Sequence, residues 1–140
     1  SILNSIKSLS KEGASIVYTT HYMEEVEILC DNIIILDKGK IIASGTNDEL
    51  KNLIDVEEKI TIEVNDVSED LINSINEIKE VIDVKKVNNN IIINYKNGKS
   101  NLENLIMFLK RNKIKYNKIF SERPTLNDVF LSLTGKELRD

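Results

Sequence analysis

Hydrophobic and polar positions follow two different patterns along the chain, and the pattern changes near residue 55. Before that point, short runs of consecutive apolar residues stand between segments with helical spacing, which is typical of an α/β core. After it, apolar residues alternate with polar ones, as in strands that bury one face. The sequence therefore predicts a mixed α/β (α+β) protein of two domains, residues 1–54 and residues 55–140.

The first domain is expected to run helix, strand, helix, hairpin, helix. Residues 14–20, mostly apolar or β-branched, predict a strand that is buried on both faces. A short amphipathic helix follows His21, with Glu24 and Glu25 expected to be solvated in its first turn. Two apolar runs joined at Gly39 predict a β-hairpin, and a capping-box spacing from Thr46 predicts the last helix.

The second domain is expected to contain a complete small sheet. Strand and helix patterns over residues 59–121 follow the order β-α-β-β-α-β, which defines a ferredoxin-like unit. Residues 124–135 predict a closing helix, because Thr125 can cap its start and Gly135 can end it. The predicted fold is thus an α/β segment followed by a ferredoxin-like domain with a C-terminal helix.

The amino-acid composition of the chain limits the classes of partner that it is expected to bind. The 140 residues carry a net charge of -4 from 19 basic and 23 acidic side chains, so nucleic acid is not expected as a partner. No apolar run approaches the roughly 18 to 20 residues that cross a bilayer, so no direct membrane insertion is expected. The single cysteine, Cys30, excludes an intramolecular disulfide, fits a reducing cytoplasmic setting and leaves no expected metal site.

His21 is the only histidine in the chain and directly follows the predicted buried strand. A side chain just beyond the carboxyl end of a parallel strand points into the crevice where α/β sheets bind ligands. Without further context, such a histidine is more often a loop residue that only forms hydrogen bonds. The surrounding sequence supplies that context.

Residues 14–50, "ASIVYTTHYMEEVEILCDNIIILDKGKIIASGTNDEL", resemble the end of the nucleotide-binding subunit of ABC transporters. In that family a strand leads to a switch histidine, a short helix follows, and a hairpin carries the pattern G-x-I-x-x-x-G, here Gly39, Ile41 and Gly45. Residues 124–135, "PTLNDVFLSLTG", resemble the end of an accessory C-terminal domain found in the drug- and antibiotic-export branch.

The resemblance implies that residues 1–54 end a P-loop ATPase core in which His21 contacts the γ-phosphate of ATP. Thr20 is a weaker candidate for nucleotide contact. The G-x-x-x-x-G-K-[ST] loop, the signature helix and the Asp-Glu strand that holds Mg²⁺ do not occur in these 140 residues. The parent protein is therefore expected to bind ATP and Mg²⁺, whereas this segment alone is expected to bind no cofactor and to be inactive as an ATPase.

The resemblance also implies a second ATPase subunit and a transmembrane permease as partners, at the cytoplasmic face of the membrane, with export as the expected direction of transport. Residues 1–54 of this chain are expected either to associate with the same segment of a second copy or to be less ordered than residues 55–140, because a strand without neighbours is a template for pairing. Residues 55–140 are expected to mediate contact between two ATPase subunits, or between the ATPase and its membrane partner, through the face that carries the last helix. The alternative is that they form a small-molecule sensor. Its candidate residues, Glu63, Lys85, Tyr95 and Tyr116, are scattered rather than convergent, which disfavours it.

Overall fold

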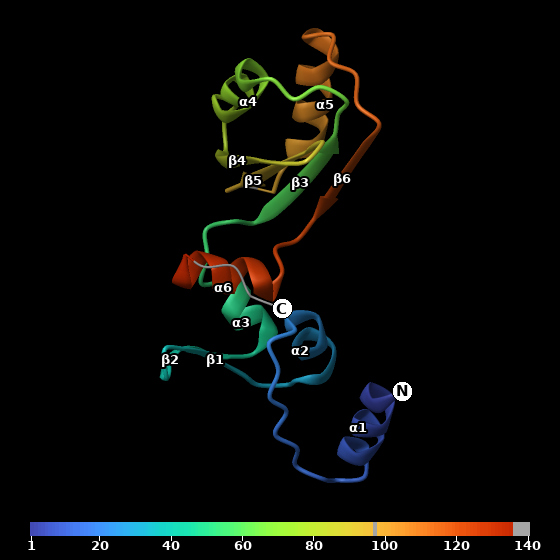
Figure 1. The fold of residues 1–140 in the computed structure, drawn as a ribbon, viewed down its shortest axis with the longest axis vertical. Coiled ribbons are helices and arrows are strands. Elements are labelled where there is room, and N and C mark those ends of the chain that lie inside the picture. Colours follow the sequence, from blue (N-terminus) through green and yellow to red (C-terminus); the bar gives the residue numbers. More distant parts are fainter. Residues whose placement is uncertain (97, 136–140) are drawn as a thin grey trace. The chain divides into compact units, whose positions relative to one another are not determined.

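The computed structural model describes residues 1–96 and 98–135, and these divide into two compact units (Figure 1). Unit 1 combines residues 1–54 with the C-terminal segment that begins at Thr125. Unit 2 consists of residues 55–124. The chain thus leaves unit 1, completes unit 2 and then returns to unit 1.

Unit 2 is built on a four-stranded antiparallel sheet with the strand order β4-β5-β3-β6. The order strand, helix, strand, strand, helix, strand predicted for residues 59–121 is confirmed. Its elements are β3 (Glu58–Glu63), α4 (Glu69–Asn76), β4 (Val81–Val87), β5 (Asn90–Tyr95), α5 (Asn101–Arg111) and β6 (Lys118–Glu122).

The core of unit 2 lies on one face of this sheet. Ile60 and Ile62 stand two residues apart on β3, so both point to the same face, where they are fully buried. Ile75 of α4 and Leu105 and Leu109 of α5 pack in the same core. Each fully buried Ile or Leu side chain contributes about 1.5–3 kcal/mol to the free energy of unfolding. Both helices therefore cover the same side of the sheet.

Tyr95 is the largest side chain in this core. Burial, and then the nearby charge of Glu58, raise the pKa of its hydroxyl. The hydroxyl has no hydrogen-bond partner among the residues that the structure describes. It therefore stays protonated at neutral pH and belongs to the core, not to a surface site.

The predicted hairpin of unit 1 is confirmed as β1 (Ile33–Asp37) and β2 (Lys40–Gly45), paired antiparallel. Its two-residue turn has positive φ at both Lys38 and Gly39, with φ values of 50° and 74°. This is the type I′ geometry whose twist matches that of the flanking strands. Glycine at the second position adopts it without steric cost.

Four helices complete unit 1: α1 (Ile2–Lys11), α2 (Met23–Leu29), α3 (Asn47–Lys51) and α6 (Leu126–Thr134). The predicted ends of α6 are confirmed. Thr125 and Asp128 form a reciprocal capping box at its start, and Gly135 ends it with a φ of 70°.

The structure groups α6 differently from the sequence-based prediction, which assigned it to a domain of residues 55–140. Its apolar stripe packs in unit 1 against α2, α3 and the hairpin. Helical spacing shows that a helix has an apolar face, but it does not specify which surface covers that face. The buried members of this core are Val26, Ile33, Ile35, Leu50, Leu126, Val129 and Phe130.

The strand predicted over residues 14–20 does not form in this structure, although all seven residues are described. The segment belongs to no sheet, and Val17 is 95% exposed. A strand needs a neighbouring backbone for its hydrogen bonds, and β1 and β2 pair only with each other among the described strands. The apolar pattern was therefore necessary for a buried strand but not sufficient.

Leu126→Ala is expected to destabilise unit 1 and to leave unit 2 almost unchanged. The side chain is fully buried, so its truncation should cost about 2–5 kcal/mol. Hydrogen exchange of both units checks this: amides of α2 and α3 should lose protection. Leu133→Ala, on the same helix but 41% exposed, is the matched control and should have little effect. Loss of protection confined to the four-stranded sheet would contradict the grouping of α6 with unit 1.

Candidate functional site

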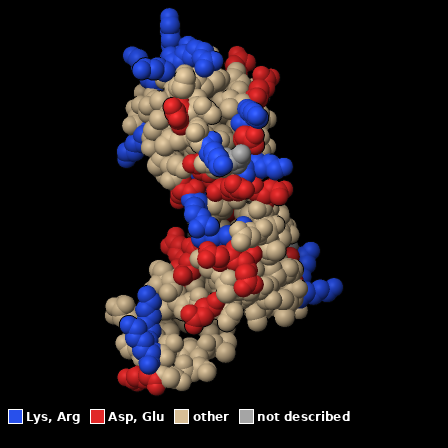
Figure 2. Space-filling view, turned by 180° about the vertical axis from the view of Figure 1, so that it is seen from behind, with Lys and Arg blue, Asp and Glu red and all other residues tan. Residues whose placement is uncertain are grey.

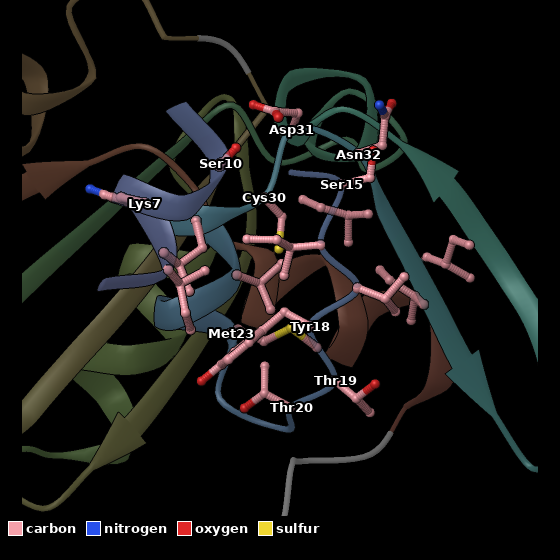
Figure 3. A pocket seen from close by; sticks show the side chains of 18 of the residues that line it. Lys7, Ser10, Ser15, Tyr18, Thr19, Thr20, Met23, Cys30, Asp31 and Asn32 are labelled. Carbon is pink, nitrogen blue, oxygen red and sulfur yellow. The ribbon is translucent and has the colours of Figure 1, made fainter. Parts of the chain in front are cut away.

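A groove of about 1080 Å³ in unit 1 is the main candidate site (Figure 3). It is lined by α1, residues 14–21, α2, the start of the hairpin and Phe130. Much of this lining is apolar and exposed, including Val17, Ile34, Leu36 and Ile41. The groove thus joins an apolar surface to the histidine segment singled out by the sequence.

His21 lies in the groove lining, two residues before α2 begins. Its side chain is exposed, and its ring lies beside that of Tyr22, with 4.2 Å between ring centroids and a 34° tilt. An imidazole held in this way is open to a ligand, because each ring nitrogen can donate or accept a hydrogen bond. The structure therefore places His21 where a ligand could reach it, and its contact with nucleotide stays a prediction.

Thr20, which precedes His21 in the sequence, lies in the same groove lining (Figure 3). Its Oγ1 accepts a hydrogen bond of 3.0 Å from the backbone N–H of Tyr22. Such a side-chain bond two residues along the chain stabilises the turn into α2. Thr20 therefore has a local structural function at the point where a nucleotide contact was considered.

Tyr18 and Glu25 form a contact that the sequence did not predict, since Glu25 was expected to be solvated. The Tyr18 hydroxyl donates a hydrogen bond to the Glu25 carboxylate. This bond, followed by partial desolvation and the charge of Glu25, raises the pKa of Tyr18. The contact ties the segment before His21 to α2, and no spacing rule in the sequence indicates it.

Glu27 on α2 connects three segments that are far apart in the sequence. Its Oε1 accepts a hydrogen bond of 3.1 Å from the backbone N–H of Leu126 and lies 3.0 Å from the Lys51 ammonium. The carboxylate thus satisfies a free N–H at the start of α6, where a negative charge is also favoured by the helix dipole. Glu27 and Leu126 are 99 positions apart, so the sequence carries no signal for this bond.

Neither a metal site nor a membrane-spanning helix occurs in the described part of the chain. Residues 1–96 and 98–135 contain no group of three or more His, Cys, Asp or Glu side chains arranged to hold a metal ion. None of their helices is long and apolar enough to span a bilayer. Cys30 lines the groove and is partly buried, and this burial raises the pKa of its thiol.

The sequence of this chain is similar to ATP-binding proteins of ABC transporters. The chain is 33% identical to the linearmycin resistance ATP-binding protein LnrL of Bacillus subtilis, over 99% of this chain and 45% of that protein. It is 31% identical to the Nod factor export ATP-binding protein I of Cupriavidus metallidurans, over 96% and 42%. It is 29% identical to an uncharacterized ABC transporter ATP-binding protein, YhaQ of Bacillus subtilis, over 91% and 41%.

Residues 45–134 match the family described as ATP-binding protein DrrA1-3-like, C-terminal domain, and the chain belongs to that family. The match begins at the end of the hairpin and extends to the last residue of α6. It therefore includes all of unit 2 and the helix that returns to unit 1. The chain spans less than half the length of the three relatives above.

Glu27→Ala is expected to lower the stability of unit 1 by about 1–3 kcal/mol, because it removes a charged acceptor from a partly buried N–H and from Lys51. Urea unfolding followed by amide signals from unit 1 measures the change. Glu24→Ala, on the exposed side of the same helix, provides the control and should change stability by less than about 0.5 kcal/mol. Equal effects of the two substitutions would show that the Glu27 contacts contribute nothing.

Proposed function

We propose that this chain is the C-terminal part of the ATP-binding subunit of an ABC transporter, whose complete polypeptide couples ATP hydrolysis to export. The observation that carries the proposal is the exposed His21 in the groove, directly before the turn into α2, within a sequence of this family. The names of two relatives, which refer to linearmycin resistance and Nod factor export, support an export role.

In this proposal His21 contacts the γ-phosphate of ATP. An imidazole N–H can donate a hydrogen bond to a phosphoryl oxygen and stabilise charge that develops there during transfer. Thr20 is less suited to nucleotide contact, since its Oγ1 already accepts the bond from Tyr22. The phosphate loop and the Mg²⁺ ligands would come from other residues of the complete polypeptide, because their motifs are missing from this sequence.

The apolar side of the groove would be covered by the rest of the ATPase core. Residues 14–20 belong to no sheet, and Tyr18 holds them to α2 through Glu25, so their backbone is available to pair with a neighbouring strand. Exposed contiguous apolar surface commonly marks an interaction site. When residues 1–54 lack that cover, we expect them to self-associate through the same surface.

We further propose that unit 2 is a ferredoxin-like domain. The observed strand order and the alternation of strands and helices are those of a split βαβ unit. A small-molecule sensor is not favoured: Tyr95 is buried in the core, whereas Lys85 pairs in register with Ile92 on the opposite face. The complete subunit would act with a second ATPase subunit and a membrane permease, at the cytoplasmic face of the membrane.

His21→Ala in the complete polypeptide is expected to lower ATP turnover by about 100-fold or more while ATP binding changes only a few-fold, because the contact acts mainly on the transition state. Steady-state hydrolysis and nucleotide titration measure the two effects. Asn32→Ala, at an exposed position elsewhere in the groove lining, is the control. Turnover that stays near normal in the histidine variant would argue against the role.

Amides of residues 14–20 are expected to exchange rapidly in the 140-residue chain and slowly in the complete polypeptide, because pairing with a neighbouring strand would protect them. Hydrogen exchange with mass spectrometry compares the two proteins. Residues 90–95, which are already paired in β5, serve as the internal reference. Equally rapid exchange of the segment in both proteins would mean that no strand forms there.

A further inference from the structure

The face of the sheet in unit 2 opposite the helices carries an ordered pattern of side chains. Since α4 and α5 pack on the face of Ile60 and Ile62, the alternate residues of each strand lie on the other face. On β3 and β6 the register places Lys59 beside Glu122, Thr61 beside Phe120, and Glu63 beside Lys118. Charge therefore alternates in sign both along and across the two strands.

The middle of this pattern is apolar. Phe120 is 50% exposed, and the neighbouring Thr61 is only 7% exposed although it is polar. Ile92 of β5 lies on the other side of Thr61 in the register. A large exposed aromatic side chain at the centre, with charged residues at the rim, is the usual anatomy of a protein interface. Figure 2 shows one face of the molecule, on which Lys and Arg side chains gather in clusters next to clusters of Asp and Glu.

The charges on β3 and β6 are self-complementary, whereas the exposed Lys85 of β4 lies on the row of Thr61 and Ile92 and would face Lys85 of the second copy. Consider two copies whose sheets face each other, related by a two-fold axis that lies between the sheets and runs across the strands, along the row of Thr61 and Phe120. This axis places each end of the pattern in one copy opposite the other end in the second copy. Lys59 of one copy then faces Glu63 of the other, Glu122 faces Lys118, and the two Phe120 rings meet near the axis. An isologous contact of this kind needs the same patch on both copies.

A two-fold axis along the strands fits less well. If it ran between β3 and β5, it would exchange β4 with β6 and place Asp83 opposite Glu122 of the second copy. Two carboxylates in direct opposition disfavour that arrangement. The sheet therefore distinguishes one symmetric pairing from the other.

We propose that unit 2 binds a second copy of this chain through the helix-free face of its sheet, with the two-fold axis across the strands. Four strands of about six residues cover only about 20 Å by 20 Å. This is smaller than a standard interface, so a weak association is expected, with a Kd in the micromolar range or above. The inference depends on unit 2 alone and does not require the proposed ATPase role.

Charge reversal with rescue tests the proposal in the full 140-residue chain, by sedimentation equilibrium. Lys118→Glu should raise the dimer Kd about 10-fold, because the carboxylate introduced into each copy would face Glu122 of the other. Glu122→Lys alone should weaken the homodimer in the same way. A mixture of the two single variants should form a heterodimer within about 3-fold of the original Kd, because opposite charges then meet across the axis. Lys110→Glu, exposed on α5, is the control for charge alone.

A second pair of variants separates this face from the apolar groove of unit 1. The reference chain and every variant also carry Val17→Asp, which places a charge in the apolar groove of unit 1 and removes self-association through it. In this background Phe120→Asp should abolish the association, whereas Met107→Asp, at a comparably exposed position on α5, should not change it. Thermal unfolding of each variant verifies that it is folded. The proposal is overturned if the chain is monomeric at about 1 mM, if Phe120→Asp dimerises normally, or if the two charge variants form no tighter heterodimer than their homodimers.

Discussion

The burial of α6 against α2, α3 and the hairpin is the interaction on which the organisation of this chain depends. The hairpin and two short helices contribute four of the buried residues described in their core, and α6 contributes the other three. Glu27 reinforces the contact by accepting the first N–H of the helix. Because α6 follows unit 2 in the sequence, unit 1 is completed only by residues on both sides of unit 2.

Local signals explain which parts of the fold could be predicted. The turn at Lys38 and Gly39 and the cap at Thr125 depend on the conformational preferences of residues that are close together in the sequence. The sheet of unit 2 follows from alternation within each strand. The location of α6 was not predictable in this way, because its stripe of apolar residues fits any apolar surface of the right size. Residues 14–20 show the same limit, since a strand also requires a partner.

In the candidate site, too, some features were predictable from local sequence and others were not. His21 could be selected from the sequence because it is the only histidine and follows an apolar run, and the structure exposes it in the groove. The contacts that position the surrounding segment were not predictable. Tyr18 reaches Glu25 across the turn, and Thr20 bonds the backbone of Tyr22, so both depend on how the chain bends before α2.

The insertion of unit 2 between the two parts of unit 1 has a consequence that is independent of how the units are oriented. Residues 54 and 55 and residues 124 and 125 connect them directly, so each copy of unit 2 carries one copy of unit 1 on two short covalent connections. If two copies of unit 2 associate, the two histidine-bearing grooves are held at a high effective concentration. Even a weak contact between sheets would then favour any further interaction between the two copies of unit 1, without a new contact at the grooves themselves.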